Sequence, residues 1–483
     1  MELKDTSPTK KFDEKEIKCP YCFKIFHHHE VGFRAEPVSQ KIIEEYRHKI
    51  TEVDIDEETA KEYTVKLENA QKYEKQRDDI WLNYWLGKGW AENGALYENE
   101  EGYDEHTEPG RESILTEQQE VVITPGNENS DLLVRYIPDA DNFCSAGMDN
   151  LGRKMKKRIC PHCHNLLPQN YGKYDIKFIS VVGISGSGKT VMLSQLLKNI
   201  DDYALGVGAD VIFDAGANTI NEFTKQYPVA NNSPLPTGTR EHFAPPIFLP
   251  FSKVTNGVRK NTTIVIYDIA GESCIRATGL EQYGPFVKNA DGIIFLLDPR
   301  QIAGFAFADA NAEKPAAVLD AMAQAFLLES TSQSKVPIAV AYSKSDKLRE
   351  TGALVQESHV FKNIDYTGKG FMQSEYHNVK FEVERLMNKY AHSKNLHRRV
   401  HTYFTNCGFF AFSSLGHDTE IEKDENGQEK QVLRQNLESI RIEEPLMWIL
   451  AELGLIDKVN KTAEGGKKDA ASGPLGFIKR IIK

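Results

Sequence analysis

The eight residues GISGSGKT, from Gly183 to Thr190, constrain this chain more than any other part of its sequence. They satisfy the pattern G-x-x-x-x-G-K-[ST], and they join the apolar stretch KFISVVG to the helix-like stretch VMLSQLLKNI. Glycines in such a loop let backbone N–H groups wrap a phosphate, and the amino terminus of the following helix adds a favourable dipole. The motif therefore predicts a strand, a loop and a helix that together bind nucleotide phosphates.

The residues of this loop have separate expected roles. Lys189 would contact the β- and γ-phosphates of the nucleotide, and the Thr190 hydroxyl would bind Mg²⁺. The predicted phosphate-binding set is Gly183, Ser185, Gly186, Ser187, Gly188, Lys189, Thr190 and Val191. The alternative is a glycine-rich structural turn that matches the pattern by accident. The strand and helix patterns on either side disfavour it.

The chain beyond residue 174 alternates apolar, strand-like segments with longer helical ones, which is typical of an α/β sheet. Six strands are expected, at residues 177–183, 245–251, 262–268, 292–298, 337–343 and 408–414. A helix over residues 443–456 would close this domain. The long stretches 201–235 and 300–334 then count as insertions, which we expect at the nucleotide edge of the sheet.

Two of the later strands end in residues that would distinguish guanine from adenine. In the segment PIAVAYSKSD, Lys344 would pack over the base, and the Asp346 carboxylate would accept hydrogen bonds from guanine N1–H and N2–H₂. Adenine offers neither donor in that arrangement, so a buried carboxylate there would be left without a partner. In GFFAFSSLG, the backbone N–H of Ser414 would meet guanine O6. These segments predict a guanine-nucleotide site.

Two other segments carry candidate γ-phosphate sensors. TTIVIYDIAGE ends a strand in D-x-x-G, where Asp268 would hold Mg²⁺ through water and the Gly271 N–H would bond the γ-phosphate. NNSPLPTGTREHF offers Thr237 and Thr239 as the threonine that binds Mg²⁺ and the γ-phosphate, and we favour Thr239 because it lies closer to the next strand. The predicted Mg²⁺ ligands are Thr190, Thr239 and Asp268.

Together these motifs resemble those of the TRAFAC-class, Ras-like P-loop GTPases, over about residues 174–456. Within that class the chain looks most like bacterial double-GTPase proteins with an amino-terminal zinc ribbon, which are attributed to conflict or defence systems. The resemblance implies a Ras-like α/β domain, with a six-stranded and mostly parallel sheet flanked by helices. It also implies a Mg²⁺-dependent GTPase that acts as a molecular switch, with Asp268 and Gly271 in its second switch region.

Two residues depart from the pattern of that class. Ser343 stands where Asn or Thr is usual, so the side chain that braces the base loop against the phosphate loop is shorter, and we expect weaker nucleotide affinity. Glu272 follows D-x-x-G where Gln is frequent; a carboxylate can orient or deprotonate water, but it repels a γ-phosphate. We therefore expect slow intrinsic hydrolysis, with Lys189, Thr239 and Glu272 as candidate catalytic residues. The alternative for Glu272 is a solvated switch residue without a catalytic role.

Four of the seven cysteines form two C-P-x-C pairs: Cys19, Cys22, Cys160 and Cys163. Two such knuckles supply the four thiolates that a tetrahedral Zn²⁺ ion needs, with no position left for a catalytic water. Redox C-x-x-C motifs are the alternative, but those normally begin a helix, whereas these pairs lie between strand-like residues. The neighbouring histidines, residues 27–29, 162 and 164, are expected to be solvated rather than ligands.

The 137 residues between the two cysteine pairs require an insertion within the zinc ribbon. Residues 51–150 contain 25 acidic and 8 basic residues, whereas the whole chain has a net charge of -11, so the remainder is mildly basic. We expect a helical run from Asp54 or Asp56 to Leu86, then an acidic linker with one strand near EVVIT. The predicted domains are a split zinc ribbon (1–36 and 151–173), a helical and acidic insertion (37–150), a GTPase domain (174–458) and a flexible basic tail (459–483).

The sequence also predicts the location of the protein, its partners and the alternatives to a hydrolysing switch. No stretch has the 18 to 20 apolar residues that a membrane crossing needs, which predicts a cytoplasmic protein with no transmembrane segment. Besides guanine nucleotide, the expected partner is another protein, a second GTPase or a second copy of the chain. Nucleic acid is disfavoured, although the basic run RKMKKR adjoins the second knuckle.

The tryptophans Trp81, Trp85 and Trp90 are expected to pack inside the protein rather than to dock a partner. The alternatives to a hydrolysing switch are a GTP-bound scaffold that does not hydrolyse and a P-loop ATPase.

Overall fold

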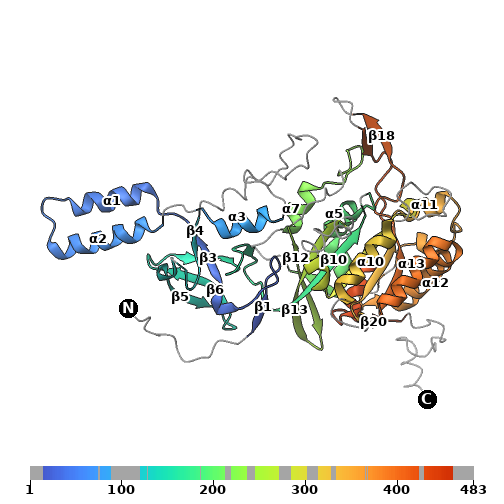
Figure 1. The fold of residues 1–483 in the computed structure, drawn as a ribbon, viewed down its shortest axis with the longest axis horizontal. Coiled ribbons are helices and arrows are strands. Elements are labelled where there is room, and N and C mark those ends of the chain that lie inside the picture. Colours follow the sequence, from blue (N-terminus) through green and yellow to red (C-terminus); the bar gives the residue numbers. More distant parts are fainter. Residues whose placement is uncertain are drawn as a thin grey trace, which may run out of the picture.

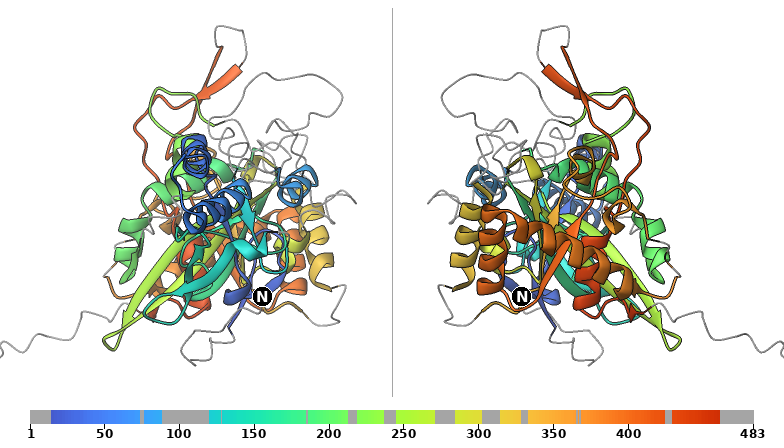
Figure 2. Two further views of the ribbon diagram at one scale, coloured as in Figure 1. Left: turned by 90° about the vertical axis from the view of Figure 1, so that its left-hand side faces the viewer. Right: turned by 90° about the vertical axis from the view of Figure 1, so that its right-hand side faces the viewer.

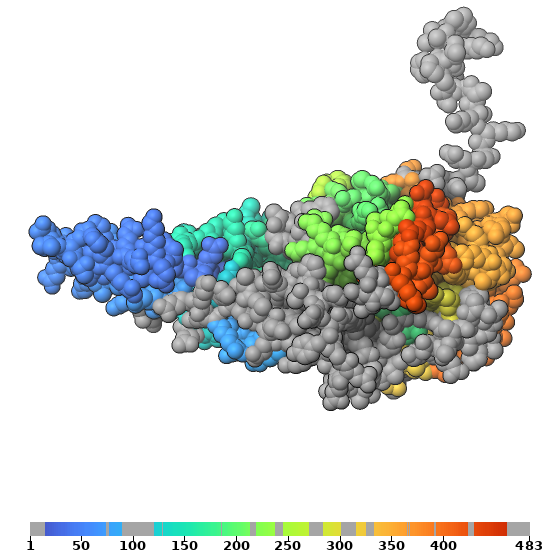
Figure 3. Space-filling view, turned by 90° about the horizontal axis from the view of Figure 1, so that it is seen from above, coloured from blue at the N-terminus to red at the C-terminus, as the bar shows by residue number. Residues whose placement is uncertain are grey.

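The computed structural model is an elongated molecule (Figure 1). It describes residues 15–73, 77–88, 120–127, 129–184, 186–212, 219–236, 245–270, 284–301, 314–327, 333–364, 366, 368–423 and 429–460. A pair of helices, α1 (Gln40–Ile50) and α2 (Glu57–Gln71), projects from one end, and an α/β sheet forms the other end (Figures 1 and 3). Within the described residues, no helix combines the length and the apolar character that crossing a membrane would take.

Seven strands form the central sheet, in the spatial order β11-β12-β13-β10-β14-β15-β17. The five strands from β13 to β17 are parallel, whereas β12 is antiparallel to β13 and β11 is antiparallel to β12. Their bounds are β10 (Asp175–Gly183), β11 (Ala209–Val211), β12 (Ile247–Thr255), β13 (Val258–Ala270), β14 (Gly292–Leu297), β15 (Ile338–Tyr342) and β17 (Cys407–Ala411). The mixed α/β class is confirmed. Six strands were expected, but the described residues form a sheet of seven, because part of the supposed insertion 201–235 forms the edge strand β11.

Strands β12 and β13 are longer than expected because a tight hairpin joins them. Thr255 pairs with Val258, and the two residues between them, Asn256 and Gly257, have φ angles of 52° and 77°. An Asn-Gly pair with positive φ at both positions is the usual two-residue turn of an antiparallel hairpin. The turn therefore explains why this one pair of neighbouring long strands is antiparallel.

Side chains alternate between two apolar clusters on the two faces of the sheet. For example, Phe178 and Val265 belong to one cluster, while Ile179 and Ile264 belong to the other. The second cluster includes α5 (Lys189–Lys198), α6 (Ile200–Gly206), α7 (Thr219–Gln226) and α14 (Glu444–Glu452). The first cluster includes α10 (Lys314–Leu327), α11 (Ser345–Glu350), α12 (Gln373–Lys389) and α13 (Ala391–Tyr403). Helices thus cover both faces of a largely parallel sheet, as such sheets require.

Among the described residues before β10, the strands form three small sheets: β1 with β2, the four-stranded order β4-β3-β8-β9, and the three-stranded order β5-β6-β7. Their bounds are β1 (Glu16–Lys18), β2 (Ile25–His27), β3 (Gly32–Ala35), β4 (Val121–Ile123), β5 (Leu133–Pro138), β6 (Cys144–Asp149), β7 (Lys154–Met155), β8 (Lys157–Ile159) and β9 (Leu166–Leu167). The strand expected near EVVIT is β4, which pairs with β3. The described residues of the expected insertion beyond residue 119 therefore include the strands β4, β5 and β6.

The helical run expected to end at Leu86 is broken into two helices, α2 and α3 (Asp79–Leu86). Each begins at its own aspartate: the Asp56 side chain accepts a hydrogen bond from the Thr59 N–H (2.8 Å), and that of Asp78 accepts one from the Trp81 N–H (3.1 Å). Such amino-terminal caps satisfy backbone N–H groups that lack partners within the helix. Asp56 is confirmed as a helix cap, but the single long helix is wrong.

A hairpin of β18 (Glu420–Lys423) and β19 (Glu429–Val432) stands out from the α/β part of the molecule (Figures 1 and 2). Residues 232–235 pair with β19 and the residue after it. The Asn232 N–H donates to the Leu433 carbonyl and the Leu235 N–H donates to the Gln431 carbonyl, both at 2.8 Å. The remaining elements are η1 (His28–Glu30), η2 (Ser130–Leu132), η3 (Pro299–Gln301), η4 (His359–Phe361) and the short parallel pair β16 (Phe371–Met372) and β20 (Lys458–Val459).

The loop of the first cysteine knuckle packs directly against the central sheet. The Phe23 ring contacts Phe286 and Phe178, with centroids 4.9 and 5.8 Å apart. The hydroxyl of Tyr267, on β13, is buried and donates a 2.7 Å hydrogen bond to the carbonyl of Pro20. One apolar cluster consequently runs from the ribbon into the sheet without interruption.

Candidate functional site

The loop between β10 and α5 has the backbone geometry that its glycines permit. Gly186 and Gly188 have φ angles of 76° and 85°, in the left-handed region that favours glycine. Gly183 has no room for a side chain, because a Cβ there would lie 2.6 Å from the Ser187 Oγ. Gly188 is the residue before the first turn of α5, so the loop leads into the amino terminus of a helix.

Lys189 and Thr190, the first residues of α5, are both buried at the carboxyl edge of the sheet. The Lys189 ammonium group donates hydrogen bonds to the carbonyls of Gly183 (2.6 Å) and Ile184 (3.3 Å). The Thr190 hydroxyl lies 3.3 Å from an oxygen of Asp268, near the end of β13. One oxygen comes from the first turn of α5 and the other from β13, and both are the ligand type that Mg²⁺ prefers, so the pair fits a Mg²⁺ ion.

Ser343 connects the loop after β15 to the phosphate-binding loop. Its hydroxyl donates a 2.7 Å hydrogen bond to the Ser187 carbonyl and lies 3.3 Å from the Leu297 carbonyl. The shorter side chain therefore does reach the loop, which removes the physical reason for expecting weaker nucleotide affinity from this position. The next residue makes a second connection: the Lys344 ammonium group donates to the Gly186 carbonyl at 2.6 Å.

Asp298, at the end of β14, anchors Lys344 and had no role in the sequence-based prediction. Its side chain is completely buried and accepts from Lys344 Nζ (2.5 Å) and Arg300 Nη2 (2.6 Å). Burial alone would raise the pKa of Asp298, but the hydrogen bond from Arg300 and the charge of Lys344 outweigh it and lower the pKa. The signal in the sequence was an acidic residue directly after the apolar strand 292–297.

Asp346, on α11, is the candidate guanine-reading carboxylate and is 6 % exposed. Burial raises the pKa of Asp346, although a 2.5 Å hydrogen bond from the Ser413 hydroxyl opposes the shift. Ser413 was missed in the sequence, where its neighbour Ser414 was singled out instead. Ser414 is nearly buried at the same strand end, and its carbonyl accepts a hydrogen bond from the Ser439 hydroxyl (2.7 Å). The structure thus brings Ser343, Lys344, Asp346 and Ser414 to the edge of the sheet that carries the phosphate-binding loop.

Five other residues named from the sequence lie outside the described part of the chain: Ser185, Thr237, Thr239, Gly271 and Glu272. Val191, the remaining member of the expected set, lies in the first turn of α5.

The four knuckle cysteines converge on one point, although 137 residues separate the two pairs. The Sγ atoms of Cys19 and Cys163 are 3.7 Å apart, and those of Cys22 and Cys160 are 3.8 Å apart. Four thiolates around a tetrahedral Zn²⁺ at about 2.3 Å would be separated by about 3.8 Å. The cluster therefore has the dimensions of a zinc site.

The two knuckles have the same backbone geometry. In the first, the Tyr21 N–H points to the Cys19 sulfur at 3.4 Å, and in the second the His162 N–H points to the Cys160 sulfur at 3.4 Å. Phe23 and His164, each directly after the second cysteine of its knuckle, have φ angles of 57° and 54°. Burial raises the pKa of Cys19 and of Cys163, so these thiols keep their protons unless a metal displaces them.

Two of the neighbouring histidines are buried, so the expectation that all are solvated is wrong. The His164 Nδ1 lies 2.8 Å from Asp78, which also pairs with Arg34 Nη2 at 2.9 Å. The His28 Nδ1 accepts a hydrogen bond from the Cys144 N–H at 3.2 Å. Both rings thus lie in the interior, and the group that could hold a metal ion contains only the four cysteines.

Other residues noted in the sequence also lie in the interior. Trp81 and Trp85 are buried, and the Trp85 indole donates to Asn165 at 2.9 Å, which confirms that they pack inside the protein; Trp90 lies outside the described residues. In the basic run beside the second knuckle, Arg158 is completely buried and donates to the Tyr171 carbonyl, and Arg153 pairs with Asp149.

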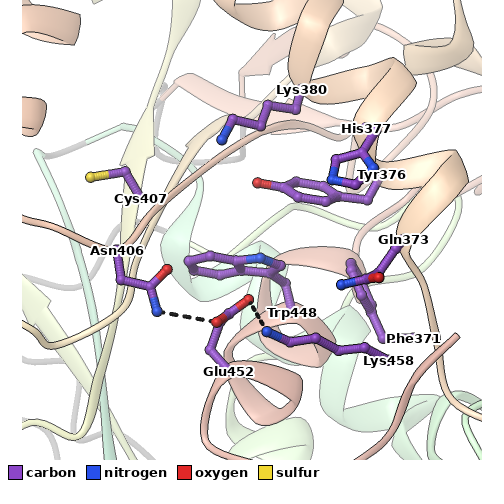
Figure 4. Close-up of a pocket in the computed structure, with 10 residues that line it drawn as sticks. All are labelled: Phe371, Gln373, Tyr376, His377, Lys380, Asn406, Cys407, Trp448, Glu452 and Lys458. Carbon is purple, nitrogen blue, oxygen red and sulfur yellow. Dashed lines mark hydrogen bonds and ion pairs between the residues drawn. The ribbon is translucent and has the colours of Figure 1, made fainter.

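A pocket lies at the opposite edge of the sheet from the phosphate-binding loop, at the start of β17 (Figure 4). Lys458 crosses its base and pairs with Glu452, which also accepts a hydrogen bond from Asn406 (Figure 4). Trp448 and Tyr376 form apolar walls. None of the sequence-predicted site residues lines this pocket.

Fold and site together define a mixed α/β protein that carries a phosphate-loop motif at one sheet edge and a four-cysteine cluster at its amino-terminal side. Residues 177–399 match the family model described as Double-GTPase 2, so this part of the chain is similar to double-GTPase type proteins. No curated protein gives a significant match.

Proposed function

We propose that this protein is a Mg²⁺-dependent molecular switch that binds and hydrolyses GTP on a Ras-like P-loop domain. The observation that carries the proposal is the direct connection between the phosphate-binding loop and the candidate base loop. Ser343 bonds the Ser187 carbonyl and Lys344 bonds the Gly186 carbonyl, so a nucleotide held by one loop meets the other. The family match over residues 177–399 supports the same conclusion.

The order of the strands supports this assignment. In the parallel order β13-β10-β14-β15-β17, the chain leaves β10 toward α5 at the point where the strand order reverses. Ligands of open α/β sheets bind outside the carboxyl ends of the strands at such a point. Thr190, Asp268, Lys344 and Asp346 all lie at or just beyond these ends.

Guanine selectivity follows from the environment of Asp346. A carboxylate that is 6 % exposed and whose pKa is raised by burial gains most from a ligand that donates hydrogen bonds to it. Guanine offers two such donors and adenine offers none in that position, so we infer that GTP and GDP are preferred over ATP.

For hydrolysis, we assign Lys189 to the phosphates, Thr190 and Asp268 to Mg²⁺, and Thr239 and Gly271 to the γ-phosphate, with Glu272 beside the attacking water. Mg²⁺ would neutralise charge on the transferred phosphoryl group. The Glu272 carboxylate repels that group, so we propose slow intrinsic turnover that a protein partner, a second GTPase or a second copy of the chain raises. The four-cysteine cluster would hold structural Zn²⁺ in a ribbon assembled from residues 1–36 and 151–173.

Nucleotide titration tests the proposal. Purified protein is titrated with fluorescent GDP, GTP and ATP in Mg²⁺, and Lys189→Ala should abolish binding because its ammonium group is lost from the phosphates. Asp346→Asn should weaken the preference for guanine. The matched controls are Lys198→Ala, at the exposed end of α5, and Glu350→Gln, on the same short helix as Asp346, and both should bind as wild type does. Equal affinity for ATP and GTP would favour the P-loop ATPase instead.

A second measurement separates a switch from a scaffold. Multiple-turnover release of phosphate from GTP, lost in Lys189→Ala, is expected for the switch. Tight GTP binding with no phosphate release would favour a scaffold that recruits its partner through the ribbon and the α1–α2 pair. Turnover as fast as that of a metabolic enzyme would contradict the role given to Glu272.

A further inference from the structure

A second cluster of metal-binding side chains lies far along the chain from the cysteines. Among the residues that the structure describes, two groups of Cys, His, Asp or Glu have ligand atoms within 4.8 Å of one another: the four cysteines, and Glu384 with His397 and His401. Glu384 belongs to α12, and the two histidines belong to α13, which packs against it (Figure 1).

Both imidazoles direct the same ring nitrogen to one carboxylate oxygen. The Nε2 atoms of His397 and His401 lie 3.3 and 3.8 Å from the Glu384 Oε1. Ligands of a tetrahedral Zn²⁺ at 2.0 to 2.1 Å are about 3.3 Å apart, so these three atoms are close to the spacing that one ion requires. The ion would replace the hydrogen bond that His397 now shares with Glu384.

The arrangement is fixed by the fold rather than by flexible side chains. The two histidines are four residues apart on α13, so they lie on the same face, one turn from each other. Their rings pack against Phe409 of β17, with centroid distances of 4.9 and 5.4 Å, which limits the rotamers available to both. A site whose ligands are already ordered loses little entropy when it binds an ion.

The charges around the cluster permit a cation. The Glu384 Oε1 lies 3.3 and 3.8 Å from the Nε2 atoms of the two rings, so the carboxylate places negative charge where the ion would lie. Lys380, one helical turn before Glu384, is the positive group that opposes binding.

We propose that Glu384, His397 and His401 form a binding site for a divalent late transition metal, with Zn²⁺ the best-suited ion. Two imidazoles and one carboxylate are ligands that Zn²⁺ accepts, and they leave a fourth position open to solvent. His401 is half exposed, so an ion reaches the site from the surface. The bound ion would join α12 to α13, whose chain continues into β17 and the Ser413–Ser414 segment.

The test measures zinc in the full-length protein with its cysteine site filled. After the zinc content is determined by mass spectrometry, Zn²⁺ is added by calorimetric titration in the absence of nucleotide. One equivalent beyond the cysteine site is expected. Glu384→Gln and His401→Ala should each weaken this equivalent by at least about tenfold, because even loss of a group that only supports a ligand costs 10 to 100-fold.

A matched control is available on α1, where His48 lies 3.8 Å from Glu52 without a second histidine in the pair. His48→Ala should leave the additional zinc equivalent unchanged. Glu384→Gln keeps an oxygen toward both rings, so it tests the site if His401→Ala reduces stability. No additional equivalent in the wild type, or an equivalent that persists unchanged in both variants, would overturn the proposal.

Discussion

At the scale of single residues, one hydroxyl joins the two loops of the candidate nucleotide site. The buried Ser343 side chain reaches the Ser187 carbonyl across 156 positions of sequence, at 2.7 Å. Because this hydroxyl bonds the phosphate-binding loop, a movement of that loop would also move the candidate base loop. The sequence identified this position, but only the structure shows that a serine is long enough to span it.

Ser343→Ala should lower both nucleotide affinity and stability. The variant leaves a buried carbonyl with one partner fewer, which costs about 1 to 2 kcal/mol of unfolding free energy. Denaturant unfolding and nucleotide titration measure the two effects. Ser252→Ala is the control, since the Ser252 hydroxyl on β12 is buried without a hydrogen-bond partner in the structure. An equal loss of stability in both variants would contradict the bracing role.

Glu443 predicts a pH dependence of stability. This carboxyl precedes α14, is 5 % exposed, and burial raises its pKa from 4.5 to about 6. Between about pH 4.5 and pH 6, Glu443 is therefore protonated in the native state and ionised in the unfolded state. The free energy of unfolding falls as the pH rises through this window. A shift of about 1.5 units corresponds to about 2 kcal/mol.

Glu443→Gln should accordingly stabilise the protein by up to about 2 kcal/mol at pH 7 and by almost nothing at pH 4.5. Unfolding free energies from denaturant curves at several pH values provide the measurement. Glu438→Gln, at an exposed acidic residue nearby, should show no such difference. A Glu443→Gln effect that is the same at both pH values would show that the carboxyl titrates normally.

At the scale of elements, the first knuckle is held against the sheet by the strand that ends in the candidate Mg²⁺ ligand. Tyr267, which bonds the Pro20 carbonyl, directly precedes Asp268 on β13. Tyr267 therefore contacts the first cysteine knuckle, while the next residue, Asp268, contacts Thr190 in the candidate nucleotide site. The contact joins the first knuckle directly to the strand that carries the candidate Mg²⁺ ligand.

Tyr267→Phe should weaken that link without opening a cavity. Loss of the hydroxyl removes one buried hydrogen bond, which costs about 1 kcal/mol, and leaves the zinc content unchanged. Thermal unfolding and zinc analysis measure the two results. Tyr63→Phe, on α2 and away from the sheet, is the control. Unchanged stability in Tyr267→Phe would mean that water replaces the hydroxyl at Pro20.

The sequence predicted most elements that have a strong local pattern. The strand, loop and helix around Gly183–Lys189 were predicted because their apolar runs and glycines are unmistakable. The strand β11 was missed because its three residues are too few to show a period, and the break between α2 and α3 was missed because charged residues continue through it. The acidic residue after β14 is visible in the sequence, but the pairing of Asp298 with Lys344 and of Ser413 with Asp346 depends on contacts between separate strand ends. The cluster of Glu384, His397 and His401 depends on how α13 folds back against α12.

At the scale of the whole molecule, the ribbon and the sheet share one apolar cluster that contains Phe23, Phe178 and Phe286. Two parts that share a core unfold together rather than separately. A metal ion bound by the four cysteines would therefore influence the stability of the sheet as well.

Cys160→Ser should lower the melting temperature of the entire protein in a single transition. The variant removes one of the four thiols proposed to bind zinc, and zinc binding supplies folding free energy to such sites. Calorimetry and circular dichroism follow the unfolding, with Cys407→Ser, a buried cysteine outside the cluster, as the control for the substitution itself. A sheet transition at the wild-type temperature, preceded by a separate ribbon transition, would contradict the shared core.

Because the two cysteine pairs lie far apart in the sequence, the ribosome also synthesises them at different times. With 137 residues between Cys22 and Cys160, the second pair of cysteines is made roughly 7 to 27 s after the first, at the usual rates of translation. Tyr267, which covers the first knuckle, follows later still. During that interval the first two thiols have neither their partner cysteines nor the sheet to shield them, so the newborn chain is more vulnerable to oxidants than the finished protein.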